Sequence, residues 1–298
     1  RKINVSDLLY VLAPRINGAG RIKHGSHAVA LLLSENKEEA MTRARAIELL
    51  NSERKELDQK ITAQAINQIK ENQEEESYST VVFQPDWHKG VVGIVASRLI
   101  ETHYRPTVVF AASGDYYTGS VRSVKGLDVY NILEACQEHI VQFGGHRYAA
   151  GLTIKPEDYL AFKKAFELAV ARNIKPEQRI PSIAYDLEMT LDKFTPKFYR
   201  IIAQMSPFGP GNMRPVFLTK NCLDGGATRA VGQDQGHLKL DVTDTSKVTL
   251  SGIGFGMAYH INKIKSRDRF QILFTLDENE FRGVKSMQLK LKDLRFSN

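Results

Sequence analysis

Residues 80–112 read TVVFQPDWHKGVVGIVASRLIETHYRPTVVFAA, and their pattern is the strongest indication of the fold class. TVVFQ is a short apolar run typical of a strand, and PDWHKGVVGIVASRLIETH leads from a loop into a helix. RPTVVFAA is a second apolar run of strand length. Strands that alternate with helices predict a sheet covered by helices, so this part of the chain belongs to the α/β class.

The alternation continues toward the C-terminus. The segments are a turn into a strand at YYTGSVRS (116–123), a helix at DVYNILEACQEHIVQF (128–143), a strand at GLTIKP (151–156) and a helix at EDYLAFKKAFELAVARN (157–173). FGGHRYAAG (143–151) sets two glycines, a histidine and an arginine before small residues. Its simplest interpretation is a turn. The alternative is a binding site, because glycines let a backbone approach a ligand closely.

A long helix precedes the α/β segment. Residues 36–72 contain no proline or glycine, and Ile47, Leu50, Leu57 and Ile61 recur at helical spacing. A helix of that length extends about 50 Å, more than a compact domain needs. We therefore expect it to connect two domains.

The last third has a different pattern. Alternating strands are expected at HLKLDV (237–242), RFQILFTL (269–276) and MQLKLKDLRF (287–296), with Lys290 and Lys292 outward on the last of them. About five short strands with one basic face fit a small closed barrel of the oligonucleotide-binding (OB) type. A β-sandwich is the alternative.

Charge is distributed unevenly along the chain. The net charge is +7, and residues 1–195 hold 25 basic and 25 acidic residues, whereas residues 196–298 hold 16 and 9. A basic module attached to a neutral one suggests a polyanionic partner.

Other bulk features exclude several classes of protein. Two cysteines are too few for a disulfide framework or a zinc site, and no apolar run is long enough to span a membrane. We expect a cytoplasmic protein with no membrane association. The chain begins without methionine, which suggests a fragment of a longer protein.

Four segments carry the donors that a phosphate requires: guanidinium forks, hydroxyls and backbone N–H groups at glycines. They are Arg15, Asn17 and Arg21 in PRINGAGR, His88 and Arg98 in WHKGVVGIVASR, Ser120, Arg122 and Ser123 in GSVRS, and Gly144, Gly145 and His146 in FGGH. Each also has a purely structural interpretation. Arg98 would make a surface ion pair, His88 would cap a helix, and Arg122 would pair with a carboxylate such as Asp128.

The order of these motifs, followed by PFGPGN and a terminal QLKLKDLR, resembles the RecJ family of single-stranded-DNA-specific exonucleases in the DHH phosphoesterase superfamily. The resemblance spans the chain and is most specific at residues 86–155. It implies an α/β DHHA1 domain joined to a C-terminal all-β OB-fold barrel. The implied domains are a remnant of the DHH domain (1–35), a long connecting helix (36–76), DHHA1 (77–175), a linking strand and helix (176–206) and the OB fold (207–298).

The resemblance also implies a division of labour. In the family the DHH domain holds two Mn²⁺ or Mg²⁺ ions, and this sequence has no Asp-His-His motif, so we expect no metal ligand in this chain. The parent protein would hydrolyse DNA from 5′ to 3′ in repair and recombination. Because two-metal hydrolysis needs carboxylates to hold both cations, this fragment alone is expected to be inactive.

By the same resemblance, Ser120 and Arg122 hold the 5′-terminal phosphate, with Arg15 contributing. Gly144, Gly145 and His146 contact the phosphate near the scissile bond, so His146 is the one residue assigned to the catalytic centre. The implied partner is single-stranded DNA, preferably 5′-phosphorylated, and the protein would be a monomer assisted by a helicase and a single-strand-binding protein. Two alternatives are a phosphodiesterase for short oligonucleotides and a non-catalytic single-strand-binding scaffold.

Overall fold

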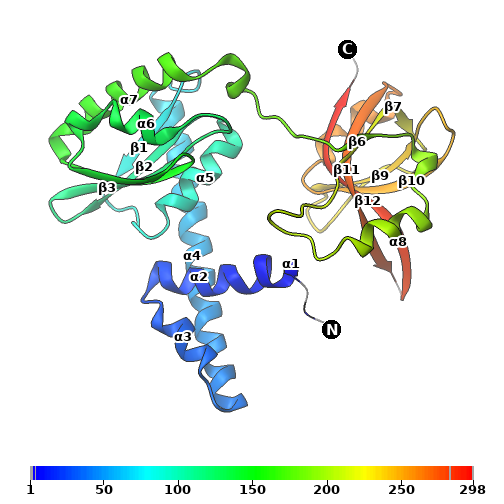
Figure 1. The fold of residues 1–298 in the computed structure, drawn as a ribbon, viewed down its shortest axis with the longest axis horizontal. Helices are drawn as coiled ribbons and strands as arrows, with labels where there is room; N and C mark the ends of the chain where they lie inside the picture. Colours follow the sequence, from blue (N-terminus) through cyan, green and yellow to red (C-terminus); the bar gives the residue numbers. More distant parts are fainter. Residues whose placement is uncertain (1–2, 4, 282, 297–298) are drawn as a thin grey trace. The chain divides into compact units, whose positions relative to one another are not determined.

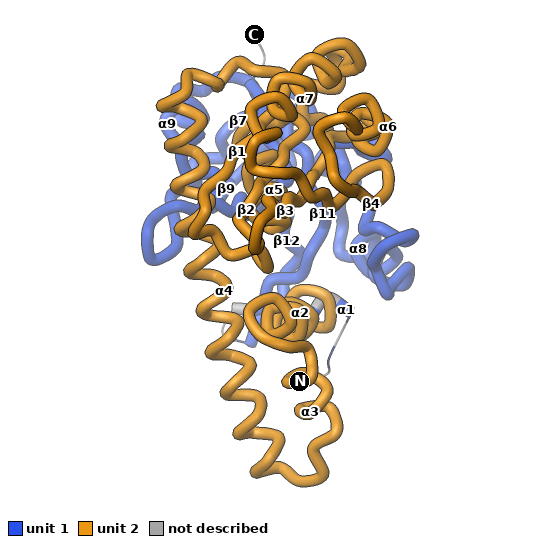
Figure 2. Tube along the Cα trace, turned by 90° about the vertical axis from the view of Figure 1, so that its left-hand side faces the viewer, with its two compact units in different colours: residues 1–7, 183–298 blue, residues 8–182 orange. Residues whose placement is uncertain are grey.

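The computed structural model describes residues 3, 5–281 and 283–296. The chain divides into two compact units, residues 8–182 and residues 1–7 with 183–298 (Figure 2). Each unit has its own hydrophobic core.

The first unit begins with helices packed on one long helix. After a π-helix (Leu8–Leu12), α2 (Ala13–Ile22) and α3 (Ser26–Leu32) lie against α4 (Lys37–Glu71) (Figure 1). The short helix α1 (Val5–Asp7) belongs to the other unit. Small and apolar side chains fill their contact, namely Ala19, Ala28, Ile47 and Leu50. The predicted long helix is confirmed. Its first residue follows the N-cap Asn36, whose side chain accepts a hydrogen bond from the Glu39 backbone N–H at 2.9 Å.

A five-stranded sheet forms the rest of this unit. Its strands are β1 (Thr80–Gln84), β2 (Thr107–Ser113), β3 (Tyr116–Arg122), β4 (Gln142–His146) and β5 (Ala149–Ile154), in the order β1-β2-β3-β5-β4. β1 and β2 are parallel and joined through α5 (Val92–Thr102), whereas the other pairs are antiparallel. The predicted α/β class is confirmed.

Helices cover the two faces of the sheet with separate cores. On one face α6 (Val129–Glu134) and α7 (Tyr159–Asn173) bury Phe110, Val121 and Leu152. On the other face α4 and α5 bury Val82 and Val109. Alternate residues of β3 therefore point to different cores, and Val121 faces α6 and α7 while its neighbours face the side of α5.

Residues 143–151 differ from the expected turn between helix and strand. The helix predicted over 128–143 ends at Glu134, and β4 and β5 form a hairpin with Arg147 and Tyr148 at its tip. Pairing with β5 outweighs the local helical pattern. Gly145 is required in this hairpin, because it has φ +157 and a Cβ there would lie 2.4 Å from the Ala149 carbonyl oxygen.

The second unit is a closed β-barrel. Its main strands are β7 (Phe217–Asp224), β9 (His237–Thr243), β10 (Thr249–Gly254), β11 (Phe270–Phe281) and β12 (Val284–Phe296). They pair in the order β7-β11-β12-β10-β9, and β7 pairs with β9 to close the ring. Leu238, Leu240 and Val242 point inward with no exposed surface. Closure supports the OB-type barrel over the β-sandwich.

Short elements complete both units. β6 (Leu187–Glu188) and β8 (Arg229–Val231) extend the barrel sheet, and α8 (Pro196–Gln204) and α9 (Ile261–Lys265) belong to the barrel unit. The 3₁₀ turns are Gln137–His139, Pro156–Asp158, Pro176–Arg179, Leu191–Lys193 and Ala258–His260. Each unit buries one cysteine, Cys136 in the core under α6 and α7 and Cys222 in the barrel core.

Candidate phosphate-binding site

The strand register places two of the predicted motifs on one face of the sheet. Across β3, β5 and β4, Ser120 pairs with Gly151, which pairs with Gly144. In the next row on the same face, Arg122 pairs with Ala149, which pairs with His146. Neighbouring strands are about 4.8 Å apart, so the Arg122 and His146 backbones lie about 10 Å apart. The hydroxyl and guanidinium of GSVRS thus share a surface with Gly144 and His146.

The N-terminal turn of α5 lies directly against Ser120 and Arg122. A Cβ on Gly93 would come within 2.9 Å of Arg122 Nη2 and 3.0 Å of Ser120 Oγ. Glycine at position 93 therefore lets the helix backbone approach both donors. Helix N-termini carry free N–H groups and a partial positive charge, which favour an anion at this point.

Arg122 is held without a carboxylate. Its Nη1 donates to Ser120 Oγ at 3.0 Å and to the Val121 carbonyl at 2.8 Å. Within the described residues its Nε and Nη2 make no hydrogen bond to protein. Asp128, the predicted alternative partner, instead caps α6 by accepting from the Tyr130 N–H at 3.0 Å. The arrangement leaves part of the fork available for an anion.

A second guanidinium increases the positive potential at this site. Burial, and then the nearby positive charge of Arg21, lower the pKa of Arg122. Arg21 comes from the last turn of α2, and its Nη1 donates to the Gly90 carbonyl at 3.2 Å. A Cβ on Gly90 would lie 2.1 Å from the Arg21 carbonyl oxygen, so α2 and the loop before α5 are in close contact.

The other predicted residues have different surroundings. His88 Nδ1 accepts from the Gly90 N–H at 3.1 Å and so shapes the loop that enters α5. Ser123 donates from its hydroxyl to the Leu127 carbonyl at 3.0 Å and orders the loop after β3. Asn17 is exposed on α2.

Two predicted phosphate-binding arginines make ion pairs within the protein. Arg15 pairs with Glu48 of α4, and its Nη1 also donates to the Val11 carbonyl at 2.8 Å. Arg98 Nη2 lies 2.7 Å from an oxygen of Asp58, also on α4. The structure therefore brings together Ser120, Arg122 and Arg21, but it places Arg15 and Arg98 against carboxylates.

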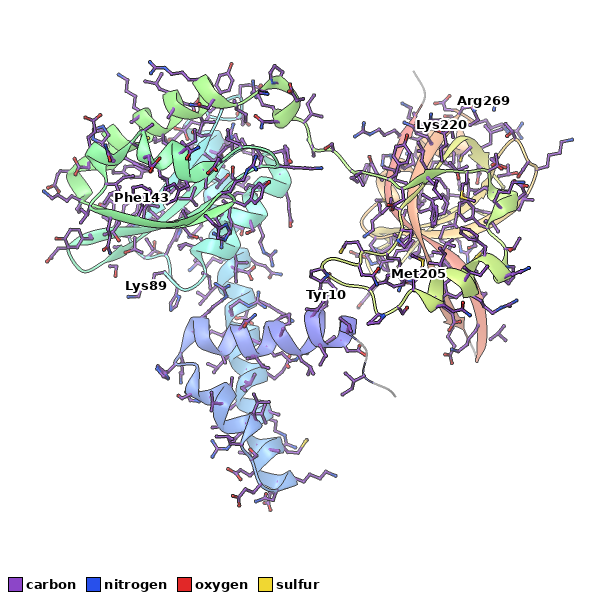
Figure 3. The ribbon with its side chains drawn as sticks, viewed as in Figure 1. Tyr10, Lys89, Phe143, Met205, Lys220 and Arg269 are labelled. Carbon is purple, nitrogen blue, oxygen red and sulfur yellow. The ribbon has the colours of Figure 1, made fainter. Side chains whose placement is uncertain are left out.

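The sequence did not indicate that Gly93 contacts Ser120 and Arg122, or that Asp58 pairs with Arg98. The glycine spacing in GVVGIVASR was a signal for close helix packing. The contact partner could not be read from it. Lys89, in the loop before α5, donates from Nζ to Ser113 Oγ at 3.4 Å. Figure 3 labels Lys89, and also Phe143 on β4.

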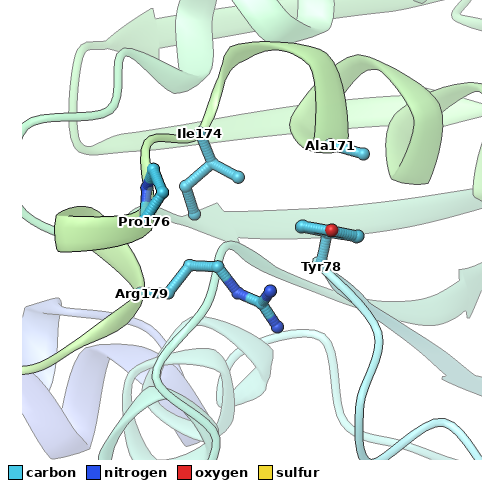
Figure 4. Close-up of a pocket in the computed structure, with 5 residues that line it drawn as sticks. All are labelled: Tyr78, Ala171, Ile174, Pro176 and Arg179. Atoms are coloured by element: carbon cyan, nitrogen blue, oxygen red, sulfur yellow. The ribbon is translucent and has the colours of Figure 1, made fainter.

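A separate cavity of about 420 Å³ lies in the same unit and contains none of the predicted residues. It is lined by Tyr78, Ala171, Ile174, Pro176 and Arg179 (Figure 4). The Arg179 guanidinium lies 4.3 Å from the centre of the Tyr78 ring.

The barrel has a basic row on its outer surface. Arg229 of β8 pairs with Lys239 of β9, Lys239 pairs with Ile253 of β10, and Ile253 pairs with Lys290 of β12. Burial, and then the charge of Arg229, lower the pKa of Lys239. Three cations thus follow one cross-strand row, which we call the barrel row.

An exposed aromatic side chain accompanies the barrel row. Phe255 is 58% exposed, its ring is 5.2 Å from that of His237, and Lys290 Nζ is 5.8 Å from its centre. An exposed ring beside cations is the arrangement on which nucleobases stack.

Comparison with known families assigns both units. Residues 76–172 match the DHHA1 domain and residues 185–293 match the RecJ OB domain. The chain therefore combines a DHHA1 domain with a RecJ OB domain, which confirms the fold expected from the resemblance.

Over almost its whole length the chain is similar to single-stranded-DNA-specific exonucleases named RecJ. It is 33% identical to that of Bacillus subtilis, covering 97% of this chain and 36% of the relative. It is 31% identical to that of Escherichia coli, covering 99% of this chain and 52% of the relative. The chain thus spans between about a third and a half of these relatives.

Solved structures show the same fold. Thermus thermophilus RecJ in complex with Mg²⁺ matches with a TM-score of 0.82 at 24% identity, over 99% of this chain and 44% of that one. The complex with Mn²⁺ matches with a TM-score of 0.82 at 25% identity, over 99% and 42%. In the described residues of this chain, no group of three His, Cys, Asp or Glu side chains could hold a metal ion. Among these residues, no helix combines the length and the hydrophobicity of a membrane span.

Proposed function

We propose that this chain is the substrate-binding portion of a 5′-to-3′ single-stranded-DNA exonuclease, and that Ser120, Arg122 and Arg21 bind the 5′-terminal phosphate of the strand. The observation that carries the proposal is the contact of α5 at Gly93 with Ser120 and Arg122. It joins a hydroxyl, a guanidinium and a helix N-terminus at one point. A terminal phosphate monoester carries more charge than an internal diester, so this group favours the end of a strand.

The hairpin supports the next step of the model. From the anchored phosphate, the strand would cross β5 toward Gly144 and His146, which lie in the same two rows. A Cβ on Gly144 would meet nothing within 4 Å, so the protein itself does not need a glycine there. We propose that this space accommodates the DNA backbone, with the His146 ring donating to a phosphate. Anchoring the 5′ end in this way would give the enzyme its polarity.

The barrel would bind the strand further along. The barrel row supplies charge and Phe255 supplies a stacking surface, which together suit single strands of any sequence. We assign no hydrolytic step to the described residues, because none of them forms a metal-binding group. In the full-length protein, Mn²⁺ or Mg²⁺ would be held by another domain, and the fragment alone would bind DNA without cutting it. We also propose a cytoplasmic monomer, aided by a helicase and a single-strand-binding protein.

The test is a comparison of 5′-phosphorylated and 5′-hydroxyl strands by fluorescence anisotropy. Arg122→Ala should abolish the preference for the phosphorylated strand. We expect this preference to be about ten- to hundredfold in affinity, because a charge-assisted contact contributes ~1.5–3 kcal/mol. Arg122→Lys should restore it in part, since lysine keeps the charge but loses the fork.

Arg172→Ala, an exposed arginine on α7, is the matched control and should leave the preference intact. If Arg122→Ala retains the full preference, the phosphate pocket is elsewhere. Release of nucleotides by this chain in Mn²⁺ would contradict the division between binding and cutting. Equal binding of dinucleotides and long strands would favour a short-oligonucleotide phosphodiesterase.

A further inference from the structure

Asp58 is a fully buried carboxylate in the middle of α4. A buried carboxylate is costly unless it is paired. One oxygen of Asp58 lies 2.7 Å from Arg98 Nη2, and the other accepts from Arg54 Nη1 at 2.8 Å. The carboxylate therefore joins an arginine of its own helix to an arginine of α5.

The α5 end of this network reaches the phosphate site. Arg98 and Gly93 belong to the same eleven-residue helix. Gly93 is the position at which α5 touches Arg122 and Ser120. Because both residues lie on one short helix, a shift of α5 at Arg98 would also shift its N-terminal turn against these two donors.

The α4 end of the network reaches α2, the helix that carries Arg21 of the phosphate site. Arg54 Nη2 donates to Asn51 Oδ1 at 2.8 Å, and Asn51 is 1% exposed. The same Oδ1 is 3.2 Å from the position of a Cβ on Gly18, so α2 is in direct contact with it. Arg21 follows one turn later on α2 and bonds to the Gly90 carbonyl.

We propose that Asp58 is a positioning residue for the phosphate pocket, holding α5 and α2 so that the α5 N-terminus and Arg21 converge on Ser120 and Arg122. This inference rests on the proposed function. Buried ion pairs add little stability compared with apolar residues of the same volume. Separating one partner from a buried pair leaves an uncompensated charge, however, and this cost holds the two helices in one position relative to each other. The network is therefore suited to setting geometry.

The experiment separates positioning from stability. The first variant is Asp58→Asn, which removes the charge with little change of shape. The second is the triple variant Arg54→Met, Asp58→Leu and Arg98→Met, which replaces the network with apolar side chains and should melt near the wild-type temperature. For each, the ratio of Kd for 5′-hydroxyl and 5′-phosphorylated strands is measured beside the thermal midpoint.

We expect both variants to lower that ratio about tenfold, the effect of one charge-assisted contact. As single substitutions, Arg98→Lys should retain more of the wild-type Kd ratio than Arg98→Met. Glu39→Gln, which breaks the Glu39–Arg43 surface pair on α4, is the control and should change nothing. A triple variant that is folded and keeps the wild-type ratio overturns the inference. If Arg122→Ala also keeps the wild-type ratio, or if the wild type shows no preference for 5′-phosphorylated strands, the proposed function fails as well.

Discussion

The phosphate site of the α/β unit and the barrel row are both cationic, but they are built in opposite ways. Arg122 is partly buried, bonded to two neutral oxygens and in contact with a helix terminus. The barrel row is a line of long side chains on an outer strand surface, beside an exposed ring. Fixed, desolvated donors distinguish one anion from another. Cations on long side chains at an outer surface attract any polyanion and are screened by salt. We expect the first site to determine which end of a strand is bound, and the second to determine how strongly the strand is held.

The largest effect should come from filling the contact at Gly93. Gly93→Val puts methyl groups where Arg122 Nη2 and Ser120 Oγ lie about 3 Å from a Cβ position, so both donors must move. We expect a ten- to hundredfold loss of the 5′-phosphate preference, measured by competition anisotropy. The salt dependence of binding should not change. Thr102→Val, at the other end of α5, is the control. An unaltered preference would show that α5 takes no part in end recognition.

An intermediate effect is expected at Phe255. Removing the ring with Phe255→Ala should weaken binding of a long strand about fivefold, near the lower end of the 1–3 kcal/mol found for stacked bases, because the ring is exposed. Phe255→Trp should retain the affinity, since it keeps an aromatic face. The ratio between 5′-phosphorylated and 5′-hydroxyl strands should stay constant in both variants. A change in that ratio would mean that the two regions do not divide the work as proposed.

The smallest effect concerns a single cation of the barrel row. Lys290→Ala should reduce the slope of log K against log[salt] by about 0.7, the value for one contact with a single strand. Titrations at four salt concentrations measure this slope. Lys197→Ala on α8 serves as the matched control and should leave it unchanged. Equal slopes for Lys290→Ala and the wild type would place the strand on another surface of the barrel.

Most of the architecture could be predicted from local patterns. The long helix, the strands flanking α5 and the inward leucines of β9 all follow from periodicity within single segments. The hairpin of β4 and β5 was missed because its pairing outweighs the helical pattern of residues 135–143. Register also could not be predicted, because it results from pairing between segments that are distant in the sequence. The rows that join Ser120 to Gly144 and Arg122 to His146 therefore appear only in the structure.

The candidate site was predictable in composition but not in connectivity. Arginine, serine and glycine motifs indicated phosphate chemistry, and two of the four segments share a face of the sheet. The sequence could not show which arginines are already paired. Arg98 and its partner Asp58 are separated by 40 positions and lie on different helices. Arg15 is similarly paired with Glu48.

The single buried cysteine in each unit has a practical consequence for kinetics. Burial raises the pKa of the Cys136 thiol to about 11 and that of Cys222 to about 12. At neutral pH each thiol is therefore protonated and shielded, and it can be alkylated only when its own core opens. The wild-type chain would be alkylated over time, and mass spectrometry of the two cysteine-containing peptides would follow the labelling of each thiol. The two labelling rates would record how often the sheet and the barrel each open. A bound oligonucleotide that slows one labelling rate but not the other would reveal which of the two cores the ligand stabilises.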